Sequence, residues 1–250
     1  MPPLVTVVTP VLNGARFLPQ ALDSVRRQDY PRVEHIIVDG GSTDGTLEIL
    51  ARAPGIAWTT APDGGMYDAI NRGFRMARGD TIGYLNADDR YVAPDAISTL
   101  AGHLAGHPEV DVVYGDFEYI DEEGRVLERA RVRDFDPRLL GHYSFVPPHA
   151  TLVRRRVVTE EGHWLDATLR FPGDWDWFVG MARAGKRFAH VPRVVSQFRS
   201  HPRSLSATLG IVARMSEVRR VCRKRRTSFL LTLWYEALYV PLRRRIGLRP

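Results

Sequence analysis

The sequence predicts an α/β protein whose first half is a doubly wound, mostly parallel sheet with helices on both faces. Short β-branched runs alternate with segments of helical apolar spacing up to about residue 115, and this alternation is typical of parallel sheets. Beyond residue 115 the alternation breaks, which indicates an irregular α+β second half. Beyond about Ser204 the chain turns helical and basic.

Five strands and four helices are predicted in the first half. Residues 4–9 form a continuous β-branched run, as expected of a strand buried on both faces. The other predicted strands are 34–38, 57–60, 81–85 and 110–114, and the predicted helices are 17–28, a helix containing Leu47 and Leu50 that Thr43 or Asp44 can cap, 67–77 and 95–105.

Shorter elements are predicted in the second half. Residues 117–120 and 125–127 flank Asp-Glu-Glu-Gly at 121–124, a sequence typical of a β-hairpin turn. The remaining predicted elements are strands at 150–153, 188–191 and 194–199 and a helix at 175–184.

The positive charge of the chain is concentrated at its C-terminal end. The formal net charge is +6, yet residues 217–250 contain ten basic and two acidic residues, which leaves the other 216 residues with a net charge of −2. A polyanion is therefore expected to meet the C-terminal tail. The tail contains no recognisable nucleic-acid-binding module, so we expect no nucleic-acid partner.

Two features indicate a reducing, cytoplasmic location. Cys222 is the single cysteine and has no partner for an internal disulfide. The N-terminus runs straight into a predicted strand, so no signal peptide is expected.

Polar residues follow four of the predicted strands, which places them at one edge of a parallel sheet. These segments are 9–14, 39–45, 63–68 and Asn86-Ala87-Asp88-Asp89. Such a group of carboxylates needs a positive charge to offset its repulsion. Mg²⁺ or Mn²⁺ is commonly held by one or two carboxylates together with substrate phosphates, so the implied ligand is a metal–diphosphate. The glycines among these segments let the backbone approach the ligand closely.

The order and spacing of these motifs resemble the family 2 glycosyltransferases, which have the GT-A fold. The motifs are Thr9-Pro10-x-x-Asn13, the run 39–46, the stretch 62–73 and 86–89. The stretch 62–73, together with 148–151 and 173–176, resembles the bacterial members that build exopolysaccharide, O-antigen and colanic-acid units. The resemblance covers about residues 3–205.

The resemblance implies a division of the chain. It predicts a GT-A domain over residues 1–205, with a nucleotide-sugar-binding half at 1–115 and an acceptor-side half at 116–205. Residues 206–250 would form a basic, aromatic-rich helical tail.

The resemblance also implies a donor site. Asp39 would accept a hydrogen bond from the base, with uracil expected, and Asp88 with Asp89 would hold Mn²⁺ or Mg²⁺ on the diphosphate. Asn86 stands where the family's first metal-motif aspartate is usual, and can contact ribose or metal-bound water. The residues implied in nucleotide-sugar binding are Thr9, Pro10, Asn13, Asp39, Gly40, Asp63, Asn86, Ala87 and Asp88.

The catalytic base implied by the resemblance is Asp174, which matches the second residue of the family's E-D motif, with Gly173 in place of the glutamate. The base would remove the acceptor hydroxyl proton in one inverting displacement. The Q-x-x-R-W signature of the family's processive members is degenerate at 197–201, which predicts transfer of a single sugar. The reaction expected from the resemblance is of the hexosyltransferase type. The predicted acceptor or diphosphate contacts are His149, Trp175, Asp176 and His201.

Residues 229–242 are apolar and aromatic and are bracketed by arginines, but they are too few to cross a bilayer. This pattern predicts a helix in the headgroup layer of an anionic membrane, and so a peripheral location on the inner face of the cell membrane, near a glycan or lipid-linked acceptor. The alternative is a helix packed on the domain or on a second copy of the chain.

Two other functions are weighed against the transferase. A sugar-nucleotide nucleotidyltransferase would need a Gly-rich loop with Arg and Lys after the first strand, where the chain has 10–14, Pro-Val-Leu-Asn-Gly. A catalytically degenerate membrane-bound scaffold is the second alternative, and it draws on Asn86 and Gly173.

Overall fold

The computed structural model describes residues 1–235, with the backbone alone at 206 and 207. The described residues form a nine-stranded sheet in the order β3-β2-β1-β4-β8-β6-β9-β5, with β7 paired to β6. The strands are β1 (Val5–Val11), β2 (Val33–Asp39), β3 (Ile56–Thr60), β4 (Thr81–Tyr84), β5 (Arg90–Tyr91), β6 (Val112–Ile120), β7 (Val126–Ala130), β8 (Thr151–Arg154) and β9 (Phe188–Arg199).

The sheet is parallel where the donor site was predicted. Strand β1 pairs in parallel with both β2 and β4, and β2 pairs in parallel with β3. Strands β6 and β9 keep this direction, whereas β5, β7 and β8 run antiparallel to their neighbours. The carboxyl ends of β1 to β4 therefore meet at one edge, as predicted.

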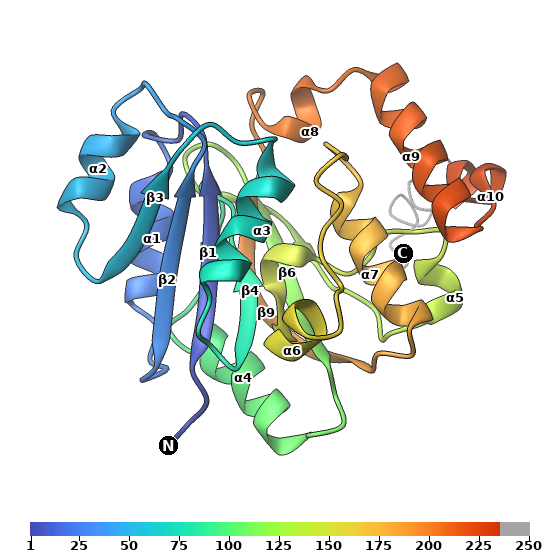
Figure 1. The fold of residues 1–250 in the computed structure, drawn as a ribbon, viewed down its shortest axis with the longest axis horizontal. Coiled ribbons are helices and arrows are strands. Elements are labelled where there is room, and N and C mark those ends of the chain that lie inside the picture. The colour runs from blue at the N-terminus through green and yellow to red at the C-terminus, as the bar shows by residue number, and fades with distance from the viewer. Residues whose placement is uncertain (236–250) are drawn as a thin grey trace.

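Helices cover both faces of this sheet, with α3 in front of β1 and α1 behind it (Figure 1). One core cluster contains Val8 with α3 residues such as Phe74, and another contains Val7 with α4 residues such as Ile97. The helices are α1 (Leu18–Arg26), α2 (Thr46–Arg52), α3 (Met66–Met76), α4 (Ala96–Gly106), α5 (Pro137–Leu140), α6 (Arg155–Thr159), α7 (Gly173–Arg183), α8 (Leu205–Thr208), α9 (Ile211–Arg225) and α10 (Phe229–Trp234), with a 3-10 turn at Pro148–Ala150.

The second half contains longer strands than predicted. Strand β6 runs without interruption through the predicted break at residue 115, and β9 joins two predicted strands. Between them the register shifts from Gly115–Val191 to Asp116–Val194. Pro192, which lacks a backbone N–H, falls in this irregularity, so a single strand survives a residue that usually ends one. The short elements β5, α5 and α6 were not predicted.

The described part of the tail packs on the domain. Val218, Val221 and Cys222 of α9 are buried in the same core cluster as Trp175 and Phe178 of α7. Within residues 1–235, no helix combines the length and the apolar character needed to cross a membrane. The predicted membrane segment 229–242 is described only through α10 and Tyr235, and the rest of it lies outside the described residues.

Candidate functional site

The loops after β1 and β2 are hydrogen-bonded to each other at the edge of the sheet. Asn13 has a φ of 52°, in the left-handed region. Its side-chain Oδ1 accepts a hydrogen bond from the Thr43 amide at 2.9 Å, and its own amide donates to Ser42 Oγ at 2.7 Å. The Gly14 amide donates to Thr46 Oγ1 at 3.0 Å. These bonds fix the shape of the edge next to Asp39.

Thr9 and Pro10 lie near the carboxyl end of β1 and are buried. The Thr9 hydroxyl lies 2.9 Å from His35 Nε2. Burial lowers the pKa of His35 to about 3, so this ring is neutral. The Thr9 hydroxyl therefore has its partner inside the fold, so a ligand at the strand end would meet the Thr9 backbone and not its hydroxyl.

Asp39 ends β2 and is fully buried. Its Oδ2 accepts hydrogen bonds from the amides of Gly41 and Ser42 at 2.9 and 3.0 Å and from the Thr60 hydroxyl at 2.6 Å. Burial alone would raise the pKa of Asp39, but the hydrogen bonds from Ser42, Thr60 and Gly41 outweigh it and lower that pKa. The other oxygen, Oδ1, is buried and has no partner. A buried charged acceptor left open in this way is a ready partner for a ligand N–H.

Gly40 and Asp63 lie against each other. A Cβ on Gly40 would come 2.7 Å from Asp63 Oδ2, so a side chain at position 40 would displace this carboxylate. Asp63 Oδ1 accepts a hydrogen bond from the Gly65 amide at 2.8 Å. The ends of β2 and β3 thus bring Asp39 and Asp63 to one part of the edge, as predicted.

The end of β4 carries residues 86–89 in four different environments. The side-chain nitrogen Nδ2 of Asn86 donates to Asp89 Oδ2 at 3.0 Å, whereas Asn86 Oδ1 is buried without a partner. Ala87 packs on the apolar cluster that contains Val11. Asp88 is partly exposed, and its Oδ2 lies 2.9 Å from His201 Nε2. The structure therefore brings His201, predicted as a diphosphate or acceptor contact, directly to Asp88.

Asp89 is closed off from solvent. It is 1% exposed, and its Oδ1 accepts a hydrogen bond from the Arg199 amide at 3.0 Å. Burial, with the neighbouring Asp88 charge, raises the pKa of Asp89 well above its usual value. The Arg199 guanidinium bonds instead to the carbonyls of Asp88, Asp121 and Glu122. Asp89 thus joins the end of β4 to β9.

Asp174 lies in the first turn of α7, across from the nucleotide half. Its Oδ1 accepts a hydrogen bond from the Trp175 amide at 2.8 Å, and the Tyr67 hydroxyl lies 3.4 Å away. Burial raises the pKa of Asp174 to about 6, partly offset by the hydrogen bonds from Trp175 and Tyr67. The carboxyl group is thus poised to exchange a proton near neutral pH, the behaviour expected of a general base.

Two buried tyrosines that sequence reasoning missed interact with Asp174. The Tyr67 hydroxyl donates to the Phe171 carbonyl at 2.7 Å and accepts from the Gly173 amide at 3.0 Å. Burial, and then the negative charge of Asp174, raise the pKa of Tyr84 well above its usual value. Tyr67 belongs to the motif 62–73, and its place in this motif was the signal that could have identified it.

Three predicted acceptor contacts are buried side chains with protein partners. His149 Nδ1 lies 2.8 Å from Ser196 Oγ, and burial lowers the pKa of His149 to about 3. The Trp175 indole N–H donates to the Leu140 carbonyl. Asp176 is 1% exposed and is ion-paired with α9. None of the three is open to an acceptor in this structure.

Metal-binding groups are sparse. Among the described residues, no three His, Cys, Asp or Glu side chains come together as a metal cluster. Asp88 and His201 supply one carboxylate and one imidazole at 2.9 Å from each other. Two protein ligands are sufficient where substrate phosphates and water supply the others, so the donor set fits a hard divalent cation bound with a diphosphate.

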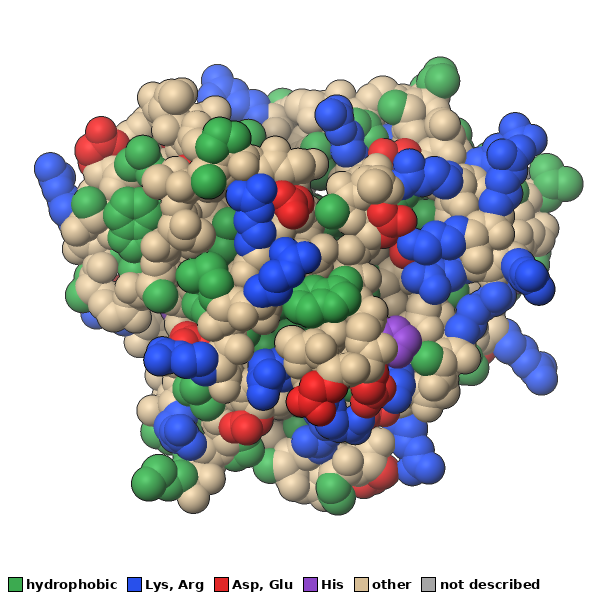
Figure 2. Space-filling model, in the orientation of Figure 1, with side chains coloured by type: hydrophobic (Ala, Val, Ile, Leu, Met, Phe, Trp, Pro, Cys, Tyr) green, Lys and Arg blue, Asp and Glu red, His purple; other side chains and the backbone are tan. Residues whose placement is uncertain are grey.

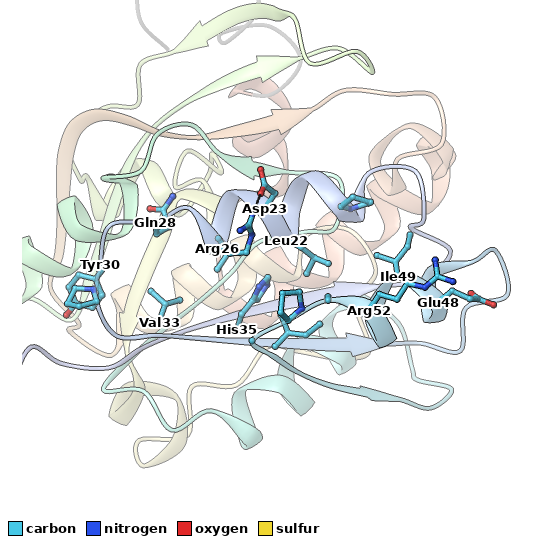
Figure 3. Close-up of a pocket in the computed structure, with 17 residues that line it drawn as sticks. Leu22, Asp23, Arg26, Gln28, Tyr30, Val33, His35, Glu48, Ile49 and Arg52 are labelled. Carbon is cyan, nitrogen blue, oxygen red and sulfur yellow. Dashed lines mark hydrogen bonds and ion pairs between the residues drawn. The ribbon is translucent and has the colours of Figure 1, made fainter.

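A separate hollow of about 600 Å³ lies on the α1 side of the sheet. Leu22 of α1, Ile49 of α2 and His35 of β2 line it (Figure 3). None of the predicted site residues is among its lining residues. The predicted donor-site residues therefore lie at the strand ends and not in this hollow.

Comparison with known proteins gives concordant matches. Residues 6–162 match the model of glycosyl transferase family 2. A PGL/p-HBAD biosynthesis glycosyltransferase of Mycobacterium bovis is 40% identical over 119 residues, which are 46% of each chain, and an uncharacterized glycosyltransferase of Rickettsia typhi is 29% identical over 75% of this chain and 62% of its own. The matched region thus spans less than half the length of the mycobacterial relative.

Solved structures share the fold. TarS of Staphylococcus aureus, in complex with UDP-GlcNAc, superposes with a TM-score of 0.73 at 16% identity, over 88% of this chain and 66% of its own. The mannosyltransferase PcManGT of Pyrobaculum calidifontis, in complex with GDP-Man and Mn²⁺, gives 0.67 at 24% identity, over 90% and 64%. The predicted GT-A fold is confirmed by these matches.

Proposed function

Since the chain belongs to the family 2 glycosyltransferases, we propose that it moves one sugar from a nucleoside diphosphate sugar to a hydroxyl of a glycan or lipid-linked acceptor. The observation that carries the proposal is the buried, unpartnered Asp39 Oδ1 at the end of β2. The N3–H of uracil would satisfy this oxygen, as would a ring N–H of guanine or thymine, and we propose a UDP-sugar as the donor. The complexes of TarS with UDP-GlcNAc and of PcManGT with GDP-Man support a nucleoside diphosphate sugar as the donor.

The proposed donor site runs along the edge from β2 to β4. Asp39 would receive the base, with Asn13, Gly40 and Asp63 around it and the backbone of Thr9 and Pro10 behind. The unpartnered Asn86 Oδ1 is suited to accept a hydrogen bond from a ribose hydroxyl. Because both oxygens of Asp89 are already bonded to Asn86 and Arg199, we assign Asp89 to holding this strand end rather than to the cation.

Asp88 and His201 would hold Mn²⁺ or Mg²⁺ at the diphosphate. When bound, the cation would stabilise the negative charge that develops on the departing nucleoside diphosphate. A Mn²⁺ ion accompanies GDP-Man in PcManGT, which supports a divalent cation in the same role.

Asp174 would act as the general base. Its carboxylate takes the proton of the acceptor hydroxyl while that oxygen forms a bond to the anomeric carbon of the donor sugar. The bond from this carbon to the diphosphate oxygen breaks, and the nucleoside diphosphate leaves with the electron pair. A single displacement of this kind inverts the anomeric configuration. Burial of Asp174 suits the role, because it raises the pKa of the carboxyl group to about 6.

The C-terminal helices provide a surface for an anionic membrane on the cytoplasmic side, where a lipid-linked acceptor of a cell-surface polysaccharide would be presented. Lys and Arg side chains gather over α9 and α10 (Figure 2). Exposed apolar side chains accompany them: Ile211, Val212, Leu230, Leu231 and Trp234. Basic residues beside exposed apolar ones are the combination that anchors peripheral proteins to anionic headgroups.

A thermal-shift screen tests the donor assignment. With Mn²⁺ present, UDP-sugars are expected to raise the melting temperature more than GDP- or dTDP-sugars, because a ligand that binds only the folded state stabilises it. Asp39→Asn should lose most of this shift. The NH2 group of the introduced side chain would point either at the amides of Gly41 and Ser42 or at the N–H of the base, and all of these are donors. Glu160→Asn, at an exposed position, is the control. If none of these nucleotide sugars raises the melting temperature, the proposal is contradicted.

A further inference from the structure

The acidic residue two positions after Asp174 is held by the C-terminal helix. Asp176 is 1% exposed, and both its oxygens are bonded to Arg225, through Nε at 2.7 Å and a terminal nitrogen at 2.9 Å. Lys224 adds a third bond at 2.7 Å. A bidentate guanidinium–carboxylate pair fixes orientation as well as distance. Because Asp176 is buried, its charge depends on these two cations for compensation, and loss of Arg225 would leave only Lys224 to provide it.

Asp174 and Asp176 project to opposite sides of the first turn of α7, since residues two apart on a helix are about 200° apart. Asp174 faces Tyr67 of α3, whereas Asp176 faces Arg225 of α9. The first turn of α7 is therefore held between the nucleotide half and the C-terminal helix, with the proposed base on the side of the nucleotide half.

The surface of α7 accommodates the guanidinium group. Gly180 lies one turn after Asp176, on the same face of the helix. A Cβ at this position would come 2.6 and 2.8 Å from the two terminal nitrogens of Arg225. A side chain at position 180 would therefore push the guanidinium group from its present place, whereas the helix itself does not require glycine there.

The same helix holds the segment just before Asp174. The Glu217 carboxylate accepts hydrogen bonds from the backbone amides of Arg170 and Phe171, at 2.9–3.1 Å. The Phe171 carbonyl in turn accepts the Tyr67 hydroxyl. The Arg214 guanidinium lies 4.3 Å from the centre of the Phe171 ring. Both the approach to α7 and its first turn are thus fixed from α9.

We propose that α9 is a positioning element for catalysis, in which Arg225, assisted by Lys224 and Glu217, holds the first turn of α7 so that Asp174 meets the acceptor hydroxyl. This inference rests on the proposed role of Asp174 as base. Arg225 does not touch substrate and acts through Asp176 and the helix backbone. The tail of the chain is then part of the catalytic machinery and not only an attachment.

The decisive comparison in the full-length chain uses two arginines of α9. Arg225→Gln removes the pair with Asp176, whereas Arg223→Gln removes the same charge from an exposed position two residues away. We expect Arg225→Gln to lower kcat at least tenfold while the affinity for the nucleoside diphosphate stays within twofold of wild type. Arg223→Gln should leave both quantities unchanged. Arg225→Lys, which keeps the charge but loses the bidentate geometry, should recover part of the loss.

Gly180→Ala provides a second route to the same state, because it displaces the Arg225 guanidinium without removing any charge. It should lower kcat in the same direction as Arg225→Gln, and it decides the question if Arg225→Gln does not fold. Equal turnover in Gly180→Ala and wild type would overturn the proposal.

Hydrogen exchange separates this inference from the proposed function. Amides of residues 173–177 should exchange faster in Arg225→Gln than in Arg223→Gln, whether or not the sugar donor has been identified correctly. Unchanged exchange would show that α9 does not hold α7. Faster exchange with undiminished sugar transfer would show that this hold does not position the base. Absence of transfer in the wild type would count against the proposed function alone.

Discussion

Asp88 Oδ2 lies 2.9 Å from His201 Nε2, which joins the end of β4 to the loop that follows β9. The two residues are 113 positions apart in the chain, and the Phe17 ring lies 5.0 Å from the His201 ring. One carboxylate oxygen and one imidazole nitrogen thus stand together at the point where the diphosphate is proposed to bind.

This pair predicts how the activity depends on the metal. Asp88→Ala should abolish Mn²⁺-dependent hydrolysis of the sugar nucleotide, because it removes the proposed carboxylate ligand. His201→Gln should raise the Mn²⁺ concentration for half-maximal activity by at least about 10-fold, because loss of a ligand weakens a metal site at least as much as a change in a supporting group does. Manganese titrations of both variants measure this. His103→Gln is the control, and a His201→Gln titration curve that overlays wild type would remove His201 from the site.

Asp174 predicts a separation of donor binding from transfer. Asp174→Asn should keep the affinity for the nucleoside diphosphate and lower sugar transfer by about 10²-fold or more, which is the scale of general acid–base catalysis. Donor affinity from calorimetry and single-turnover transfer rates measure the two effects. Asp166→Asn tests whether any acidic residue near α7 has this effect, and its transfer rate should exceed that of Asp174→Asn by at least 10-fold. An Asp174→Asn variant that transfers at the wild-type rate would require another base.

The pH profile should carry the signature of the same group. Burial raises the pKa of Asp174 to about 6, and the base must be deprotonated to take a proton. The rate of transfer should therefore rise with pH through about 6 and level off above it, opposite in direction to a mechanism that needs a protonated acid. Single-turnover rates between pH 5 and 8 measure this limb. Residual activity of Asp174→Asn should lack it, and a limb that persists in that variant would belong to another group.

The sequence allowed the donor half to be predicted because its information is local. Buried β-branched runs fix parallel strands, and parallel strands bring their ends together, so Asp39, Asp63 and Asp88 follow from chain order. The acceptor side was harder to predict because its contacts join distant segments. Pro192 and Gly115 resemble strand ends in sequence, yet lie in an irregularity between two long strands.

Burial also decided which candidate side chains have protein partners, and burial is a tertiary property. Trp175 and Asp176 directly follow the proposed base in sequence, but helix geometry turns both into the interior, where Leu140 and Arg225 are their partners. An acidic pair two residues apart has the same appearance in sequence whether one or both residues face substrate. The position of Arg225, 49 residues further along, supplied the missing information.

The membrane surface is best tested by charge removal rather than by truncation. Removing residues from 217 onward would expose the core around Val221 and would also remove Arg225, so loss of activity would have two causes. Substitution of Arg219, Arg220 and Arg226 by Gln removes three exposed charges and leaves the core contacts in place.

Each basic residue near an anionic surface contributes about 1 kcal/mol to attraction, so the triple variant should bind phosphatidylserine-containing vesicles about 10²-fold more weakly. Vesicle co-sedimentation at low and physiological salt measures this, and raised salt should narrow the gap between the variant and wild type because it screens surface charge. A matched triple substitution of Arg26, Arg27 and Arg52, which are exposed on α1 and α2 or just beyond α1, should bind as wild type does. Equal weakening by both triple variants would mean that net charge, and not the surface formed by α9 and α10, governs the association.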